Sequence, residues 1–408
     1  MTILVSILGL ALLILVHEAG HFFTALAVGM RPRKFYLGFP PAIAKVKRNG
    51  VEYGIGAIPL GGYVRIPGMH RPAKRDVELN FGPALEEAPQ LRPPLARIEL
   101  ALEAGDHPVA REELPELEQE LADANLTRVA RKQAERGLRD LEESLGADAY
   151  WRAPTWKRIA VILAGPGVNI VFAVVLLAAV YMAGIPNANS RSVESVLAGR
   201  PAAAAGLKPG DVIVAVDKRL TPSFGAVHGQ IQASNGRPIV VTVERRGHRV
   251  TLRPAAPTRV GDRYVFGYVP GVVFKQYGPL AAVGHASDDT WLSVKGMGLA
   301  IYGLFHQRDR DQLTSTVGIV RVSSDALHVS IRLYLQILGL ISLSIALLNL
   351  LPLLPLDGGH ILFSIIEGIR GRAVAREVYE RASVIGFAVI LLIAFIALSN
   401  DLGGNRPG

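Results

Sequence analysis

Four apolar stretches constrain this sequence more than any other feature. They run from about Ile3 to Met30, Ile159 to Ile185, Ile331 to Leu356 and Ala382 to Ser399. A helix needs roughly 20 mostly apolar residues to cross a hydrocarbon core of about 30 Å, and each stretch is close to that length. Half of the 408 residues are apolar and 19% are charged, a mixture typical of chains that alternate between lipid and water. The sequence therefore predicts a polytopic α-helical membrane protein with four transmembrane helices.

The first stretch has the position of a secretory signal peptide but not its composition. It lacks a basic segment before the apolar run, and no Ala-x-Ala-like site follows it. The run also continues past a His-Glu-Ala-Gly-His cluster. We expect this stretch to be retained as a transmembrane helix.

Basic residues flank the apolar stretches and orient them. If four spans cross in order, the three basic clusters fall on one side, which the positive-inside rule makes cytoplasmic. Both termini and the region from about 186 to 330 then lie outside, in a multi-pass protein of the cytoplasmic (inner) membrane. The net charge of +9 could instead indicate DNA binding. Its position beside the apolar runs favours contact with membrane lipid and no nucleic acid. The clusters are Arg31, Arg33, Lys34, Lys45, Lys47 and Arg48; Arg152, Lys157 and Arg158; and Arg370, Arg372 and Arg376.

The first cytoplasmic connection has two parts of different character. Residues 43–66 favour strands, with an Asn49-Gly50 hairpin turn between two of them. From about Pro94 the chain becomes rich in Glu, Leu, Ala and Arg, and its leucines recur every three or four residues, as in amphipathic helices. We interpret this part as a solvated helical insertion rather than as a catalytic element.

The region beyond the second span contains a compact β-rich domain of roughly 70 residues, a size consistent with independent folding. Strands are expected at Val212–Val216, Ile239–Glu244 and Val250–Arg253, after a short loop between Gly206 and Gly210. Residues 257–330 are expected to link this domain to the third span and to include a helix near 281–302.

These boundaries give the expected organisation of the chain. It comprises the first transmembrane helix (1–30), a membrane-associated β region (31–93), the charged helical insertion (94–150), the second transmembrane helix (151–186), the β-rich domain (187–256), the extracytoplasmic linker (257–330), the third transmembrane helix (331–360), a cytoplasmic connection (361–381), and the fourth transmembrane helix with its tail (382–408).

The cluster from His17 to His21 is an HExxH motif. On a helix, residues four apart share a face, so both imidazoles can reach one metal ion, and Glu18 can act as a base toward water. A helix could carry two histidines by chance. Inside an apolar run, however, ionisable groups are costly and usually functional. Because the chain has no cysteine, a thiolate zinc site and a cysteine nucleophile are both excluded.

A catalytic zinc usually takes three protein ligands, and no further candidate follows closely behind His21. Asp357 is the best candidate, because the surrounding prolines and glycines should break the third helix there. His360 is a rival by residue type, and Asp357 could instead cap a helix that begins at Gly358. The first and third spans run in the same direction, and both motifs lie toward their cytoplasmic halves, so the two can meet.

Several motifs together resemble the bacterial site-2 proteases, a family of membrane-embedded zinc metalloproteases. They are HEAGH in the first span, NLLPLLPLDGGH at the end of the third, AGPGVN (164–169) at the second, and IPLGGYVRIPGM in the β region; residues 196–220 resemble a PDZ domain. The resemblance implies His17, His21 and Asp357 as Zn²⁺ ligands and Glu18 as the catalytic base. It also implies positioning of substrate by Asn349 and, more weakly, by Asn169. The helical insertion is longer than the family pattern requires.

The resemblance implies an intramembrane endopeptidase that takes part in regulated intramembrane proteolysis. Its partner would be a single-span membrane protein already cut by another protease, such as an anti-sigma factor or a remnant signal peptide. Two other classes remain open at this point. A membrane scaffold would recruit partners through the PDZ-like domain, and a transporter would use the same histidines and aspartate to carry a metal ion.

Overall fold

The computed structural model describes residues 1–304 and 315–403. Part of the expected linker (305–314) and the end of the expected tail (404–408) lie outside the described residues. The chain divides into two compact units: residues 1–177 with 286–408, and residues 178–285.

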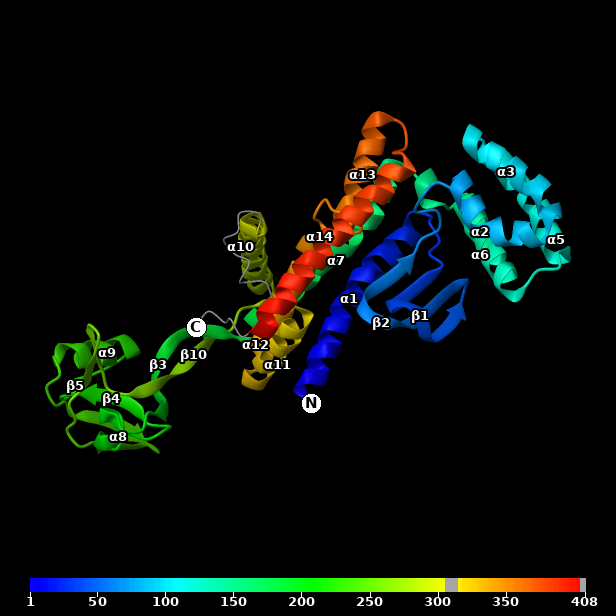
Figure 1. Cartoon of the computed structure of the whole chain (residues 1–408). Helices are drawn as coiled ribbons and strands as arrows, with labels where there is room; N and C mark the ends of the chain where they lie inside the picture. The colour runs from blue at the N-terminus through cyan, green and yellow to red at the C-terminus, as the bar shows by residue number, and fades with distance from the viewer. Residues whose placement is uncertain (305–314, 404–408) are drawn as a thin grey trace. The chain divides into compact units, whose positions relative to one another are not determined.

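Within the described residues, four helices are long and apolar enough to span a membrane, as the sequence predicts: α1 (Thr2–Ala27), α7 (Thr155–Ala183), α12 (Ile331–Asn349) and α14 (Arg376–Gly403) (Figure 1). The third is shorter than its apolar stretch. The chain leaves the helix after Asn349, passes Pro352 and Pro355, and re-enters helix at α13 (Asp357–Arg370). Proline cannot donate the helical hydrogen bond and disfavours helix before it, which accounts for the break.

Polar contacts sort the helix ends into two groups. The start of α1 meets α11 (Thr316–Val329), where Ser324 Oγ lies 3.0 Å from Thr2 Oγ1. The end of α1 meets the start of α7, where Lys157 Nζ donates to the Val28 carbonyl at 2.9 Å. Arg158, also at the start of α7, pairs with Glu367 of α13 at 2.6 Å. The loop that carries Asp357 and the region after α1 therefore belong to the same end of the bundle.

The β region is a hairpin of two long strands, β1 (Lys34–Arg48) and β2 (Val51–Arg65), joined at Asn49-Gly50 as expected. Both strands fold back on themselves. Residues 34–37 pair with 52–55 and also with 62–65, so they lie in the interior of the small sheet. The stretches 42–48 and 58–65 are consequently its two edges.

The helical part of the first connection begins at Lys74, about 20 residues before the expected boundary near Pro94. Residues 74–93 are therefore not part of the β region: they form helix and pack into the core of the insertion. Thr127 caps the last long helix by accepting a hydrogen bond from Ala130 N. The helices are α2 (Lys74–Glu87), η1 (Pro89–Leu91), α3 (Arg92–Ala104), α4 (His107–Glu112), α5 (Leu114–Asp123) and α6 (Arg128–Ser144), followed by η2 (Tyr150–Arg152).

The second unit holds a six-stranded sheet in the order β10-β3-β4-β6-β7, with β5 paired to β4. It does not end near residue 256 as expected, because Phe266 is buried in its core and Tyr268–Lys275 pairs with Ile185–Val196. The strands are β3 (Ile185–Val196), β4 (Val212–Val216), β5 (Arg219–Leu220), β6 (Val241–Arg245), β7 (His248–Thr251), β8 (Thr258–Val260), β9 (Arg263–Val265) and β10 (Tyr268–Lys275), and the helices are α8 (Pro201–Ala205) and α9 (Phe224–Ala233). The long helix α10 (Pro279–Leu304) contains the one expected near 281–302.

Candidate metal centre

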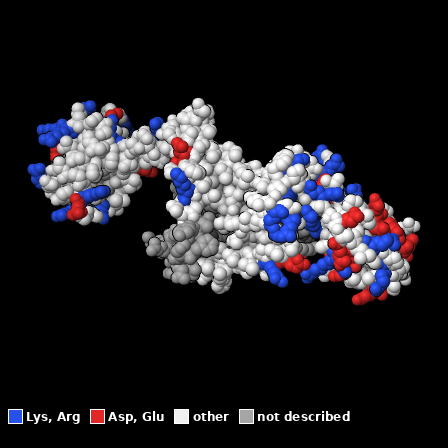
Figure 2. All heavy atoms as spheres, turned by 90° about the horizontal axis from the view of Figure 1, so that it is seen from above, with Lys and Arg blue, Asp and Glu red and all other residues white. Residues whose placement is uncertain are grey.

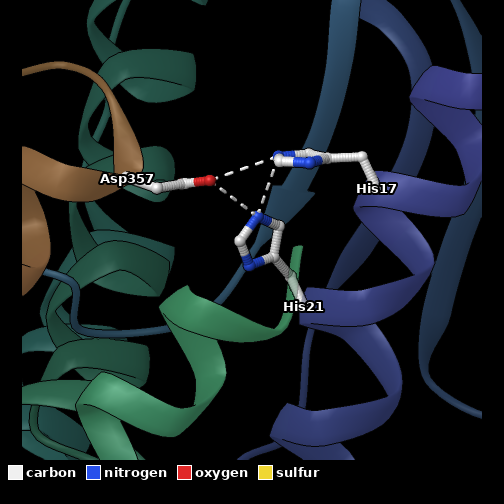
Figure 3. A group of neighbouring side chains, drawn as sticks. All are labelled: His17, His21 and Asp357. Carbon is white, nitrogen blue, oxygen red and sulfur yellow. Dashed lines mark hydrogen bonds and ion pairs between the residues drawn. The ribbon is translucent and has the colours of Figure 1, made fainter. Parts of the chain in front are cut away.

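His17 and His21 lie on one face of α1 and are both buried, each with 7% of its surface exposed. Their spacing of four residues brings the two rings together, with Nε2 of His21 at 3.2 Å from Nε2 of His17. Figure 3 shows both rings projecting from α1 toward the same point. The prediction that the two histidines share a face is confirmed.

Asp357 reaches this point from the other end of the sequence. It is the first residue of α13, and the broken segment between α12 and α13 directs its carboxylate toward α1 (Figure 3). Its Oδ2 atom lies 3.2 Å from Nε2 of His17 and 3.3 Å from Nε2 of His21. Among residues 1–304 and 315–403, these three form the only group of His, Cys, Asp or Glu side chains close enough to hold one metal ion.

The three separations match the edge of a tetrahedral zinc site. With bonds of about 2.0–2.2 Å, neighbouring ligand atoms in such a site lie about 3.3 Å apart. Each of the three atoms can offer a lone pair, so their close approach is favourable only with a cation or a proton between them. The donor set of two imidazoles and one carboxylate is one that zinc accepts, and it leaves a fourth position open.

The ring of His21 is fixed from behind. Its Nδ1 atom lies 2.9 Å from the Val161 carbonyl of α7, and only a protonated Nδ1 can donate there. This tautomer leaves Nε2 free to bind a metal, which is the usual arrangement for ligating histidines. Nδ1 of His17 is buried and has no hydrogen-bond partner in the part of the chain that the structure describes.

Two glycines allow α1 and α7 to approach at the centre. A Cβ atom on Gly165 would lie 2.3 Å from Nε2 of His21, and one on Gly20 would lie 2.5 Å from the Ala164 carbonyl oxygen. Neither position has room for a side chain. The Ala-Gly-Pro-Gly segment stands out in the sequence as a motif, but this steric role is not predicted from it, although the glycines themselves are a signal for close packing.

Glu18 faces the β hairpin. A Cβ atom on Gly62 would lie 2.1 Å from Cγ of Glu18, and the Val64 backbone N–H lies close enough to the Glu18 carboxylate to interact with it. The edge stretch 58–65 therefore runs directly beside the residue expected to act as the base. No sequence pattern predicts this contact apart from the two adjacent glycines, Gly61 and Gly62.

The remaining candidate residues lie outside the group of three. Asn349 ends α12 and is half-buried. Asn169 on α7 is fully buried, and neither atom of its side-chain amide has a hydrogen-bond partner among the described residues. Its backbone carbonyl accepts a hydrogen bond from Ser342 Oγ at 2.9 Å. His360, the rival ligand, is hydrogen-bonded through Nδ1 to the Tyr379 hydroxyl and is not a member of the group.

Comparison with known proteins shows the family of this chain. The sequence profile of Peptidase family M50 matches residues 5–393. Protease RseP of Yersinia pestis is 30% identical over 97% of each chain, and metalloprotease MmpA of Caulobacter vibrioides is 28% identical over 96% of this chain and 93% of its own. A protein of Agrobacterium fabrum, whose name describes a zinc metalloprotease, is 30% identical over 97% of this chain and 94% of its own.

The chain belongs to peptidase family M50, the site-2 protease family. It is a zinc metalloendopeptidase and a multi-pass membrane protein. The two other classes left open by the sequence, a membrane scaffold and a metal transporter, are not supported by these matches.

Proposed function

We propose that this protein cuts peptide bonds within the transmembrane segments of single-span membrane proteins. His17, His21 and Asp357 would hold zinc, and Glu18 would act as the catalytic base. The observation that carries the proposal is the convergence of three potential ligand atoms at 3.2–3.3 Å, two of them on α1, a helix long and apolar enough to span a membrane. Ionisable side chains at that depth are costly unless they serve a function.

The chemistry follows from the position of Glu18 beside the two histidines. Bound zinc would supply a Lewis acid that lowers the pKa of water to about 7 and polarises a carbonyl. Glu18 would take the proton from the attacking water and later deliver it to the leaving amine. His21, held by the Val161 carbonyl, would keep its Nε2 directed at the metal throughout.

A substrate helix must unwind locally before it can be cut, because its peptide bonds are protected by their own hydrogen bonds. The edge stretch 58–65 beside Glu18 is suited to holding the unwound segment by strand addition. The simpler alternative is that the hairpin only shapes the opening of the site.

Asn349 and Asn169 are proposed to position substrate. Asn169 has a buried amide without a hydrogen-bond partner among the described residues, and such groups usually have a reason to persist. For Asn349 the support is its place at the end of α12, where the helix breaks before Asp357.

The second unit is proposed to be a PDZ-like filter on the extracytoplasmic side. It would admit substrates already shortened by another protease, either by binding a new C-terminus or by excluding bulky ectodomains. Anti-sigma factors and remnant signal peptides are the substrate types that fit this order of events.

The proposed topology places the insertion in the cytoplasm and the second unit outside, in the cytoplasmic (inner) membrane. The absence of cysteine allows a direct test. In intact cells an impermeant maleimide should label Ala203→Cys on α8 but not Glu118→Cys on α5. Labelling in the reverse order would contradict the proposed orientation.

The proposed activity is tested by mapping the cut. Purified protein is incubated with a single-span substrate in liposomes, and the products are sequenced by mass spectrometry. A cut within the apolar segment, abolished by a zinc chelator and restored by Zn²⁺, is the expected result. A cut confined to residues outside the span would overturn the assignment of an intramembrane site.

A further inference from the structure

The helical insertion, residues 74–148, is a folded module on a closed stem. Its core is drawn entirely from residues 77–145. The two ends of the module are joined by backbone hydrogen bonds, from Tyr150 N to the Pro67 carbonyl at 2.9 Å and from Trp151 N to the Gly68 carbonyl at 3.0 Å. A Cβ atom on Gly68 would lie 2.6 Å from that of Ala149. The chain therefore leaves and re-enters the membrane unit at almost the same point.

A cluster of ion pairs connects the module to the β hairpin. Arg65, at the end of β2, pairs with Asp140 and lies 2.9 Å from Glu143 Oε2. Arg33, just before β1, lies 3.0 Å from Asp148 Oδ2 and 3.9 Å from Glu143 Oε1. The two arginines are themselves connected, because Arg33 N donates to the Arg65 carbonyl at 2.7 Å.

This cluster is partly shielded from solvent. Arg65 and Arg33 each have 30% of the side chain exposed and Glu143 has 22%, whereas Asp140 is more open, with 53% exposed. Exposed single pairs contribute little to stability, whereas a network of shielded charges can hold two elements in one arrangement. Figure 2 shows acidic and basic side chains gathered over the module, while the surface of the spanning helices is nearly free of charge.

The strand that carries Arg65, β2, is also the strand that contacts Glu18. Gly62 packs against the Glu18 side chain, and the Val64 backbone N–H lies close enough to the Glu18 carboxylate to interact with it. Arg65 is the next residue after Val64. Because the Arg65 carbonyl faces the interior strand and neighbouring residues alternate, the Val64 N–H faces the free edge. Because one peptide unit joins the two residues, a displacement of Arg65 would also displace the Val64 N–H beside Glu18.

We propose that Arg65 is a positioning residue for this reaction, and that the helical insertion sets its position through Asp140 and Glu143. The module would thereby hold the edge stretch 58–65 in register with Glu18. This inference rests on the proposed role of Glu18 as the base. Because misplacement of a catalytic group by about 1 Å can reduce a rate by roughly 100-fold, the coupling acts mainly on kcat.

The test is a charge-reversal cycle in the full-length protein in liposomes. Arg65→Glu alone, and Asp140→Arg with Glu143→Arg, should each lower kcat by about 10-fold or more with KM changed less than about twofold. Combining all three substitutions should restore part of the loss, because Arg33 still faces the new arginine at position 143. Arg97→Glu is the matched control, because Arg97 pairs with Glu113 and Glu116 inside the module, and it should leave kcat unchanged.

A milder pair of variants covers the case in which charge reversal prevents folding. Asp140→Asn with Glu143→Gln keeps the shapes of both side chains and should still lower kcat, with zinc content and melting temperature unchanged. An unaltered kcat in that variant, or a triple variant that regains nothing while folded, would overturn the inference. Failure of the proposed function would look different, since the wild-type protein itself would then hold zinc without cutting any substrate.

Discussion

Asp357 brings the two ends of the sequence together at the proposed metal position. Asp357→Asn should abolish cleavage and weaken zinc binding by more than the roughly 10–100-fold that loss of an outer-sphere partner causes. His360→Asn is the control. Because His360 Nδ1 bonds to Tyr379 and lies outside the ligand group, that variant should retain zinc. Zinc is measured by mass spectrometry of the purified protein, and loss of zinc only in the His360 variant would reassign the third ligand.

Asp211 carries a prediction about acid stability in the second unit. It is 1% exposed and accepts two hydrogen bonds of 2.7 Å from Arg245. Burial alone would raise the pKa of Asp211, but Arg245 and the Lys208 N–H outweigh it and hold that pKa below its usual range. A lowered pKa stabilises the fold above the unfolded value of about 3.9, and the contribution is lost as pH falls through the folded pKa.

The measurement is hydrogen exchange of β4 and β6 amides, corrected for intrinsic rates. Asp211→Asn should lower the free energy of opening by about 2 kcal/mol at neutral pH. The difference from wild type should shrink at pH values below the folded pKa. Equal protection of the two proteins at neutral pH would show that the pair adds nothing to stability.

At the scale of elements, the proposed strand addition of substrate to the edge stretch 58–65 can be tested. Val64→Pro removes an N–H that faces the free edge, so it should reduce cleavage with little effect on the sheet. Lys47→Pro is the matched control. The two-residue turn makes Arg48 and Val51 a hydrogen-bonded pair, so the Lys47 N–H faces away from the hairpin on the opposite edge. Undiminished cleavage by the Val64 variant would count against strand addition of the substrate and against a role of the Val64 N–H in holding Glu18.

The elements differ in how well the sequence predicts them, for physical reasons. Apolar length is enough to find α1, α7, α12 and α14, and the Asn49-Gly50 turn is enough to find the hairpin. The sequence predicts the start of the module about 20 residues after its actual start at Lys74, because α2 carries Gly82 and Pro83 within a mixed pattern that obscures its helical period. The folding back of β1 and β2 depends on contacts far apart in the chain, and no local pattern encodes it.

The candidate site also contains some features that the sequence predicts and others that it does not. His17 and His21 are given by helical spacing alone, and Asp357 by a broken helix together with span direction. The contact of Glu18 with Gly62 and Val64 could not be predicted, because it depends on how the hairpin docks against α1. The ion pairs between the module and Arg65 could not be predicted for the same reason, because in the sequence the charged residues of the module look like those of an ordinary solvated surface.

At the scale of the whole molecule, the second unit can be removed cleanly. Ile185 pairs with Lys275, so residues 186–274 can be replaced by a short linker without spreading the chain ends. If this unit excludes uncut precursors, the shortened protein should cleave intact precursor as well as the precut form. An intact precursor that stays uncleaved, while the precut form is still processed, would show that this unit alone is not the filter.

The central claim is that Glu18 acts as the base at a zinc site inside the membrane. Glu18→Gln keeps the shape of the side chain but cannot accept the proton, so cleavage should fall by about 10²–10⁴-fold. Zinc content should stay equal to that of the wild type, because Glu18 is not a member of the ligand group. The most direct measurement is therefore zinc content and cleavage of a single-span substrate, made on the same preparation of this variant. Zinc retained with cleavage lost is the predicted result, and cleavage at the wild-type rate would contradict the account.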